Sequence, residues 1–441
     1  IIGTLESYGG MSQAMAIASL ILLATYLGLY YAIFAAVGSR LWKRTPGWAL
    51  WALPALWVAL EVVRAWMISG FPWNLAAYAW TDVPGALEAS GWIGAYGISF
   101  LVVAVNVAVA LLVTRVHAVR ALATLASIAL LLALAFVATP EVEPGGKGRV
   151  VRIVQPNTPI LEEWDNDLVL EGYRRLLALS VQACEEDTLV IWPESAAWPF
   201  VLERDAQLRA DAARLNDRGC WLVLNSISHQ GDEYFNSAFL LDPTGGSKRY
   251  DKAHLVPFGE YVPFREFLMF IPQLDEVPND MVRGPGPVVW PIDVDDREVV
   301  LGSVISFEGA FVRTVRSEVN AGARVLVVAT NESSYGRGSA SDQLIGMVRM
   351  IAPSLGVDIA HAAVTGKSIF VSADGSLSES TALFEEAVLT GVIREQRSPR
   401  TFYTITGDWL QVGMMLVAAG LLLSSRSPTR GFRIRPERRR E

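Results

Sequence analysis

The segment REVVLGSVISFEGAFVRTVRSEVNAGARVLVVATNES, residues 297–333, decides the fold. Residues 297–306 and 324–333 are apolar and rich in β-branched side chains, which is typical of buried strands. Residues 311–323 between them have the amphipathic pattern of a helix. A strand, a helix and a second strand in this order predict an α/β layer fold.

The same alternation continues on both sides of this segment. Five further apolar runs are predicted strands: 149–157, 188–195, 220–228, 236–246 and 368–377. Predicted helices lie at 165–185 and near 342–355. Because sites in α/β folds gather at the carboxyl ends of strands, reactive side chains are expected there.

The chain is too apolar to be a wholly soluble protein. Of its 441 residues, 52% are hydrophobic and 19% are charged, and the mean hydropathy is +0.33. Five stretches are long and apolar enough to span a bilayer: 11–38, 48–69, 91–113, 121–139 and 409–425. The sequence therefore predicts a multi-span α-helical membrane domain joined to an α/β domain.

Charge separates the two parts of the chain. Residues 140–408 hold 24 Lys and Arg against 39 Asp and Glu, a net charge of −15, whereas the remaining residues have a net charge of +7. Basic residues follow the first, third and fifth spans: Arg40, Lys43, Arg44, Arg115, Arg120 and seven arginines in 426–441. The positive-inside rule places these three segments in the cytoplasm and residues 140–408 on the outer side.

This topology divides the chain into four segments. Residues 1–139 hold the first four spans, 140–408 the extracytoplasmic domain, 409–425 the last span and 426–441 a basic cytoplasmic tail. The sequence begins at Ile1 on the outer side, without Met or a signal-peptide pattern, so at least one further span is expected upstream.

Three reactive side chains lie at strand ends or in the loops that follow them. Glu194 ends the run VIWPE, Lys252 follows the 236–246 hairpin, and Ser306 ends LGSVIS. Each alone has a structural explanation, as a helix cap, a surface charge or a turn residue. Together, each with apolar neighbours, they indicate a catalytic site.

The cysteines and histidines predict no metal site. Cys184 and Cys220 lack metal-ligand spacing, and their separation does not suggest a disulfide framework, so both are interpreted as small apolar residues. The four histidines form no cluster in the sequence. TGKS at 365–368 lacks the first glycine of a phosphate-binding loop, so no nucleotide site is predicted.

The order Glu194, Lys252 and then a nucleophile position resembles the nitrilase superfamily, in which the three residues are Glu, Lys and Cys. The motifs resemble one family within it, the apolipoprotein N-acyltransferases. These motifs are WPES (192–195), KAHLVPFGEYVPF (252–264), ISFEGAF (305–311), SGFPW (69–73) and NESSYG (331–336). The resemblance implies an αββα sandwich and eight spans, of which three are expected upstream of Ile1.

The resemblance also implies a role for each matching residue. Glu194 resembles the general base, and Lys252 resembles the cation that stabilises the oxyanion together with the backbone N–H of Phe307. Three further residues match supporting positions. Glu260 resembles the carboxylate that holds the lysine, Glu308 the glutamate after the nucleophile, and Trp164 a tryptophan on a mobile loop over the substrate entrance.

The family's activity would be transfer of an acyl chain in two half-steps, without a cofactor. The acyl donor would be a phospholipid, and the acceptor the amine of a diacylglyceryl cysteine at the amino terminus of a bacterial lipoprotein. The expected location is the inner membrane, with the catalytic domain on the periplasmic side. The other partners expected are membrane lipids; no nucleic acid is expected, and the chain is predicted to be a monomer.

Ser306 departs from the family pattern, which has Cys. An alkanol is far less acidic than a thiol, and Glu with Lys is a weak pair for deprotonating it, so low or no turnover is predicted. The serine is either an introduced substitution or a natural variant; retention of Glu194, Lys252, Glu260 and Glu308 favours the former. The alternative functions are a membrane-bound amidase and a non-catalytic lipoprotein-binding paralogue.

Overall fold

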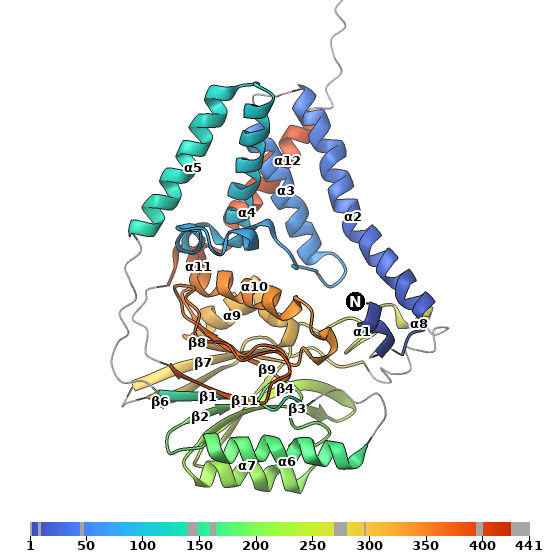
Figure 1. Cartoon of the computed structure of the whole chain (residues 1–441), viewed down its shortest axis with the longest axis vertical. Coiled ribbons are helices and arrows are strands. Elements are labelled where there is room, and N and C mark those ends of the chain that lie inside the picture. Colours follow the sequence, from blue (N-terminus) through green and yellow to red (C-terminus); the bar gives the residue numbers. More distant parts are fainter. Residues whose placement is uncertain are drawn as a thin grey trace, which may run out of the picture.

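A computed structural model describes residues 2–7, 10–44, 48–138, 149–158, 165–268, 280–294, 297–393 and 400–424. Two parts are stacked along the long axis (Figure 1). A group of helices forms one end, and a two-sheet sandwich forms the other. This is the predicted combination of a helical membrane domain and an αββα sandwich.

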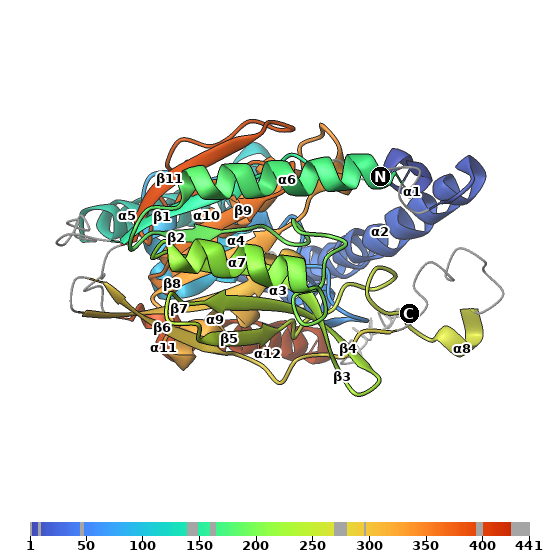
Figure 2. The same ribbon diagram turned by 90° about the horizontal axis from the view of Figure 1, so that it is seen from below.

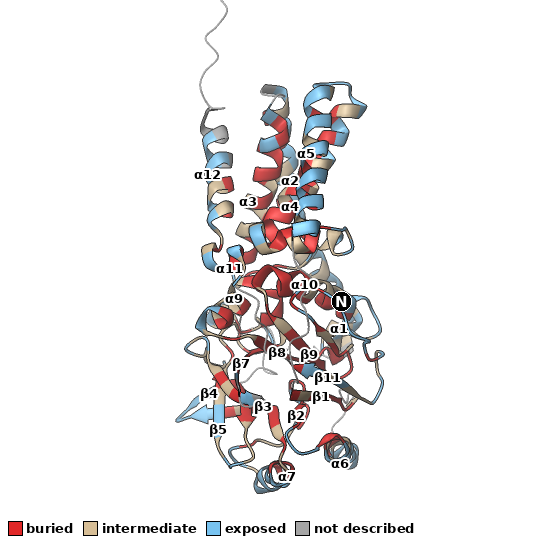
Figure 3. Ribbon diagram, turned by 90° about the vertical axis from the view of Figure 1, so that its left-hand side faces the viewer, coloured by how far each residue is buried: buried red, intermediate tan, exposed pale blue. Residues whose placement is uncertain are grey.

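Four helices in the described residues are long and apolar enough to cross a membrane. They are α2 (Gln13–Arg44), α3 (Ala49–Trp66), α4 (Ala86–Val113) and α5 (Ala118–Ala138). The predicted fifth span corresponds to α12 (Trp409–Ser424), which packs against α3. Much of the outward surface of α2, α5 and α12 is exposed (Figure 3), although these helices are apolar, as expected of helices that face lipid.

Helix α4 begins five residues before the predicted span and bends at Gly94, which has a φ of 65°. A Cβ on this glycine would lie 2.4 Å from the ring of Tyr403 in α11 (Phe402–Thr406). The bend and the close approach of the ring both require the absence of a side chain. The chain thereby places α11 beside α4.

The sandwich consists of two sheets. One has the order β11-β1-β2-β3-β4-β5 and the other β10-β9-β8-β7-β6. Strands β1, β2 and β3 are parallel, as are β7, β8 and β9. The strands of the first sheet are β1 (Arg149–Gln155), β2 (Leu189–Ile191), β3 (Trp221–Gln230), β4 (Glu233–Leu241), β5 (Ser247–Asp251) and β11 (Ala387–Ile393). Those of the second are β6 (Val289–Val294), β7 (Arg297–Ile305), β8 (Val325–Thr330), β9 (Asp358–Ala363) and β10 (Ile369–Val371).

Helices cover both outer faces of the sandwich. Helices α6 (Asn166–Ala183) and α7 (Ala206–Asp217) lie on the first sheet, as Figure 2 shows from below. Helices α9 (Val312–Ala321) and α10 (Ala340–Leu355) lie on the second sheet, between it and the membrane helices. Buried Val, Ile and Leu side chains of both sheets form the core between them, which explains the apolar runs in the sequence. Short elements complete the described fold: α1 (Ile2–Ser7), α8 (Arg265–Leu268), η2 (Ala76–Trp80), η4 (Ser306–Ala310) and η5 (Ser333–Tyr335).

Helix α10 joins the two parts of the molecule. It packs against α4, and its Met350 is buried among apolar side chains of the membrane helices. Its Arg349 forms an ion pair of 2.5 Å with Asp82, which precedes α4. The hydroxyl of Thr401, before α11, donates to the carbonyl of Ser354. The membrane helices thus rest on the helix layer that covers the second sheet.

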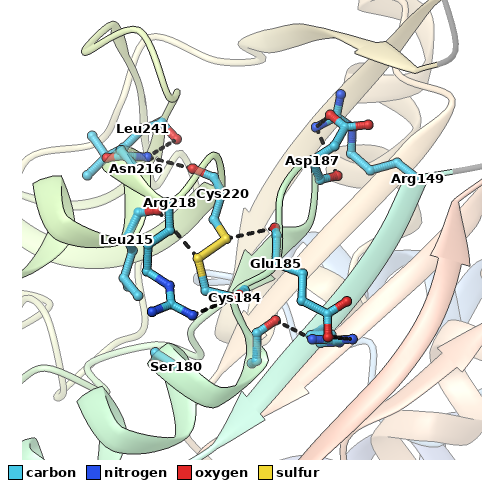
Figure 4. Close-up of a disulfide and its surroundings, with 12 residues drawn as sticks. Arg149, Ser180, Cys184, Glu185, Asp187, Leu215, Asn216, Arg218, Cys220 and Leu241 are labelled. Atoms are coloured by element: carbon cyan, nitrogen blue, oxygen red, sulfur yellow. Dashed lines mark hydrogen bonds and ion pairs between the residues drawn. A yellow bond between two sulfur atoms is a disulfide. The ribbon is translucent and has the colours of Figure 1, made fainter.

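The prediction for the cysteines is wrong. Cys184 and Cys220 form a disulfide, with their Cα atoms 5.8 Å apart (Figure 4). Cys184 follows α6 and Cys220 precedes β3, and the fold brings these ends together although they are 36 positions apart in the sequence. Both sulfur atoms are buried under the first sheet. Protein disulfides persist mainly in oxidising compartments.

Candidate active site

Glu194 follows the buried strand β2. The N–H of Trp192 donates to the carbonyl of Val223, so strand pairing fixes the start of the segment WPE. Beyond it, Ser195 has a φ of 58°, and its N–H donates to the side-chain oxygen of Asn225. The turn holds Glu194 at the carboxyl end of the strand, where its side chain is largely buried.

Lys252 follows β5 and is 1% exposed. Its Nζ lies 2.8 Å from Oε1 of Glu260 and 3.5 Å from Oε1 of Glu194. Burial disfavours the ammonium, but the charges of Glu194, Glu260 and Glu308 outweigh it and raise the pKa of Lys252. The lysine is therefore a fixed cation between two carboxylates.

Two asparagines that the sequence analysis did not identify complete this network. The amide nitrogen of Asn236 donates to Glu194 Oε1 at 3.0 Å and to Glu260 Oε1 at 2.6 Å. The amide nitrogen of Asn225 donates to Asn236 Oδ1 at 2.7 Å. This bond sets the orientation of the Asn236 amide, which then presents both of its N–H groups to the carboxylates. The available signal was an asparagine in each of two neighbouring predicted strands.

Both carboxylate oxygens of Glu260 accept hydrogen bonds. The N–H of Val256 donates to Glu260 Oε2 at 2.8 Å. Glu194 differs, because its Oε2 has no hydrogen-bond or ion-pair partner among the described residues. One oxygen of Glu194 is therefore fixed by Asn236 and faces Lys252, while the second is available to a substrate or nucleophile.

Glu308 is fully buried and ties the end of β7 to the segment around Lys252. Its carboxylate accepts from the N–H groups of Ala253, His254 and Ile305 at 2.9, 2.7 and 2.9 Å. It also accepts from the hydroxyl of Tyr250. Burial raises the pKa of Glu308 to about 7, against the opposing effect of Lys252 and these hydrogen bonds. Glu308 therefore positions the turn that carries Ser306.

Ser306 lies directly after β7 with a φ of 56°, in the left-handed region that non-glycine residues rarely adopt. Such a conformation costs roughly 1–3 kcal/mol and persists only where surrounding contacts enforce it, here those of Glu308. In the described part of the chain, no group forms a hydrogen bond with the Ser306 hydroxyl. The network thus contains Glu194, Lys252 and Glu260, and Glu308 joins the Ser306 turn to its edge.

His254, two residues after Lys252, forms no hydrogen bond with Ser306 in the described structure. The His254 ring packs against Phe311, with ring centroids 4.0 Å apart and ring planes tilted by 42°, and hydrogen-bonds to the backbone of Ser69. Burial, with the nearby positive charges of Arg313, Arg283 and Lys252, lowers its pKa to about 4, so the ring is neutral. The described residues contain no Ser–His pair at this site.

Aromatic side chains connect the site to the membrane part. Phe307 stacks on Trp73 of the SGFPW segment, with ring centroids 5.9 Å apart, and Tyr335 meets Trp73 edge-on at 6.3 Å. The indole N–H of Trp73 donates to Gln343 of α10. Gly70 enables this approach: its φ is 89°, and a Cβ there would lie 2.2 Å from the Ala65 carbonyl oxygen.

Two charged residues of α3 hold the same loop. Glu61 Oε1 accepts from the N–H of Ala76 and from the indole of Trp57, and Arg64 donates to the carbonyl of Asn74. No ion pair joins Glu61 and Arg64 in the described structure. Each instead bonds to the 70–80 loop and fixes its position.

Trp164, the predicted entrance residue, lies outside the described residues. No group of three His, Cys, Asp or Glu side chains in the described ranges is arranged to hold a metal ion. The site can therefore be described as a buried ammonium between two carboxylates, beside a strained serine. Such a set can move a proton and stabilise an oxyanion.

Comparisons with known proteins assign both parts of the chain. The family described as "Apolipoprotein N-acyltransferase N-terminal domain" matches residues 1–108, and "Carbon-nitrogen hydrolase" matches residues 150–399. The apolipoprotein N-acyltransferase of Geobacter metallireducens is 33% identical over 96% of this chain and 83% of its own length. That of Shewanella oneidensis is 28% identical over 95% of this chain and 82% of its own length. A solved amidase from Nesterenkonia sp. covers 62% of this chain and 98% of its own, with 18% identity and a TM-score of 0.44.

Proposed function

Because the chain belongs to the apolipoprotein N-acyltransferase family, we propose that it moves an acyl chain from a phospholipid to a bacterial lipoprotein. The acceptor is the N-terminal amine of the diacylglyceryl cysteine, and the intermediate is an acyl-enzyme on residue 306. The observation that carries this proposal is the buried network in which Lys252 lies between Glu194 and Glu260 beside the end of β7. No cofactor enters the reaction.

In the first half-reaction, the Oγ of residue 306 attacks the ester carbonyl of the phospholipid, and Glu194 takes the proton that this Oγ loses. The Lys252 ammonium and the N–H of Phe307 stabilise the oxyanion. The carbon–oxygen bond to the glycerol then breaks, and Glu194 returns the proton to the departing lysophospholipid. The free Oε2 of Glu194 supports this role, because Asn236 and Lys252 already fix the other oxygen.

In the second half-reaction, the acceptor amine attacks the acyl-enzyme. Glu194 takes a proton from the amine, the bond between the acyl carbon and Oγ breaks, and the proton passes to Oγ. The products are the N-acylated lipoprotein and the free side chain of residue 306. Trp164 is proposed to cover the substrate entrance during both steps.

The chain with Ser306 is proposed to be a low-activity form. A carboxylate is a weak base for an alkanol, and among the described residues no histidine forms a hydrogen bond with Ser306 that would let it act as the base instead. An oxygen ester is also a poorer acyl donor to an amine than a thioester.

The test is acyl transfer from a phospholipid to a diacylglyceryl-cysteinyl peptide, followed by mass spectrometry of protein and peptide. Ser306→Cys is expected to form an acyl adduct on residue 306 and an N-acylated peptide, whereas Ser306→Cys with Glu194→Gln should do neither. A folded Ser306→Cys protein without transfer would overturn the proposal. Release of ammonia from a small primary amide by the Ser306→Cys protein, without acyl transfer to the peptide, would support the amidase alternative.

The proposed location is the bacterial inner membrane, with the sandwich on the periplasmic side. The disulfide between Cys184 and Cys220 supports an oxidising compartment for this domain. The basic residues that follow the first, third and fifth spans support a cytoplasmic location for the segments that contain them. The proposed domains are 1–139, 140–408, 409–425 and 426–441, with membrane lipids around a monomer.

A further inference from the structure

A cavity of about 260 Å³ lies where the membrane helices meet α9. Helices α11 and α12 stand above α9 (Figure 3) and form one side of it, and α3 and α4 form the other. None of Glu194, Lys252, Glu260 and Ser306 is among its lining residues. The cavity is therefore separate from the network proposed for acyl transfer.

Arg313 of α9 is the cation of this cavity. Its guanidinium lies 4.2 Å from the ring centroid of Trp66 and 4.9 Å from that of Phe311, and it donates to the carbonyl of Ala65 at 3.0 Å. Within the described residues, no carboxylate forms an ion pair with it. A half-buried guanidinium held by two rings and one carbonyl retains donors for an anion.

A second group in the cavity also lacks a partner. Gln411 of α12 is 3% exposed and lines the cavity beside Tyr403, and in the part of the chain that the structure describes its amide nitrogen Nε2 forms no hydrogen bond of normal geometry. Buried donors in folded proteins are nearly always paired. An acceptor in the cavity would satisfy both Gln411 and Arg313.

The cavity also contains a negative charge. Asp408 accepts from the hydroxyl of Tyr403 at 2.7 Å and forms no ion pair with Arg313 in the described structure. A ligand with a net negative charge would be repelled by this carboxylate. A zwitterion, with an anion toward Arg313 and a cation toward Asp408, matches both charges.

The remaining walls are apolar and continue onto the outer surface of the membrane helices. Trp66 at the cavity is 64% exposed, and on α12 Val412 and Leu416 are 54% and 68% exposed. Exposed apolar side chains on spanning helices face lipid chains, and tryptophans gather at the membrane surface. A ligand in the cavity can therefore extend a hydrocarbon chain along α3 and α12.

We propose that this cavity binds a zwitterionic glycerophospholipid, with its phosphate between Arg313 and Gln411 and its chains along the outer surface. Arginine forms paired hydrogen bonds with phosphate, which accounts for the phosphate as the anion. The bound lipid would hold α9 of the sandwich against α3 and α12. This site is independent of the proposed acyl transfer, and either can fail without the other.

The experiment is native mass spectrometry of the full chain in detergent, titrated with dioleoylphosphatidylethanolamine. Arg313→Gln is expected to weaken the binding of this lipid about tenfold, because the substitution removes a charge-assisted contact to the phosphate. Arg316→Gln is the matched control. Arg316 lies on the same helix and donates from its Nε to the carbonyl of Thr404, but it does not line the cavity, so this variant should bind the lipid like the parent. Gln411→Leu gives a second variant that leaves the contact between Arg313 and Ala65 intact.

The other ligands test each part of the proposal. Dioleoylglycerol, which lacks the phosphate, should show no dependence on Arg313, and dioleoylphosphatidylglycerol should bind more weakly because of Asp408. Water-soluble glycerophosphoethanolamine should not compete. Equal lipid binding by the Arg313→Gln and Arg316→Gln proteins, both with parental melting temperatures, would overturn the site. Competition by the soluble headgroup at the same concentrations would overturn its assignment to a lipid.

Discussion

Phe307, directly after Ser306, stacks on Trp73 of the membrane part, with ring centroids 5.9 Å apart and the ring planes 25° from parallel. The residue whose N–H is proposed to stabilise the oxyanion thus rests on a loop that α3 holds through Glu61 and Arg64. The membrane helices do more than tether the sandwich. They supply part of the surface against which the turn with Ser306 is placed.

Trp73→Ala is therefore expected to slow acyl transfer by the Ser306→Cys protein about two- to tenfold, the range that corresponds to an aromatic pair. The rate of peptide acylation measures the effect. Trp48→Ala, which removes an exposed tryptophan before α3, is the matched control and should leave the rate unchanged. An equal fall in the acylation rate of both variants would mean that the effect comes from membrane anchoring by tryptophan and not from the contact with Phe307.

Asn236→Ala should have a larger effect, because Asn236 bonds to both Glu194 and Glu260. Loss of hydrogen bonds to charged groups costs about 1.5–3 kcal/mol each, so transfer by the Ser306→Cys protein is expected to fall at least tenfold. Tyr234→Ala, on an exposed position of the same strand, is the control. Unchanged transfer by a folded Asn236→Ala protein would contradict the role given to this network.

The sequence analysis identified the two carboxylates and the lysine of the network but not their asparagine partners, for a physical reason. Strand ends and apolar runs are local patterns, whereas Asn225 and Asn236 meet through the pairing of β3 with β4. The same limit applies to Cys184 and Cys220, which only the folded sheet brings together. Local patterns contain no information on such contacts.

Composition explains two of the strands that the prediction missed, β9 and β6. Strand β9 has the sequence DIAHAA, with few β-branched residues, and β6 contains Pro291, which is rare in strands. Both are stabilised by their neighbours: β9 pairs with β8 and β6 with β7. The α/β layer class was nevertheless predictable, because the central strands are continuous apolar runs. The αββα arrangement followed only from the resemblance to the nitrilase superfamily.

Removal of the disulfide should destabilise the sandwich. For the loop closed by Cys184 and Cys220, the chain-entropy estimate gives about 3–4 kcal/mol of the free energy of unfolding. The Cys184→Ser, Cys220→Ser double variant should melt at a lower temperature than the parent. A reductant should lower the melting temperature of the parent but not that of the double variant. Two free thiols in the unreduced parent, found by alkylation and mass spectrometry, would contradict the bond.

Glu318 gives the stability of the chain a predictable pH dependence. It is 1% exposed on α9 beneath β7, and its Oε2 has no partner among the described residues. Burial, together with the charge of Glu308, raises its pKa to about 8, against a weaker effect of the Val288 N–H. The folded state then binds a proton that the unfolded state has already lost above about pH 4.5.

The sign follows from this difference. The contribution of Glu318 to stability is fully present below pH 4.5 and is lost as the pH rises toward about 8, by up to about 1.4 kcal/mol per pH unit. Glu318→Gln, a neutral side chain of similar shape, should therefore reduce the fall in melting temperature between pH 5 and 8. Glu233→Gln, at an exposed position of β4, should retain the parental profile. Parallel curves for the parent and Glu318→Gln would show that Glu318 is ionised in the folded protein throughout this range.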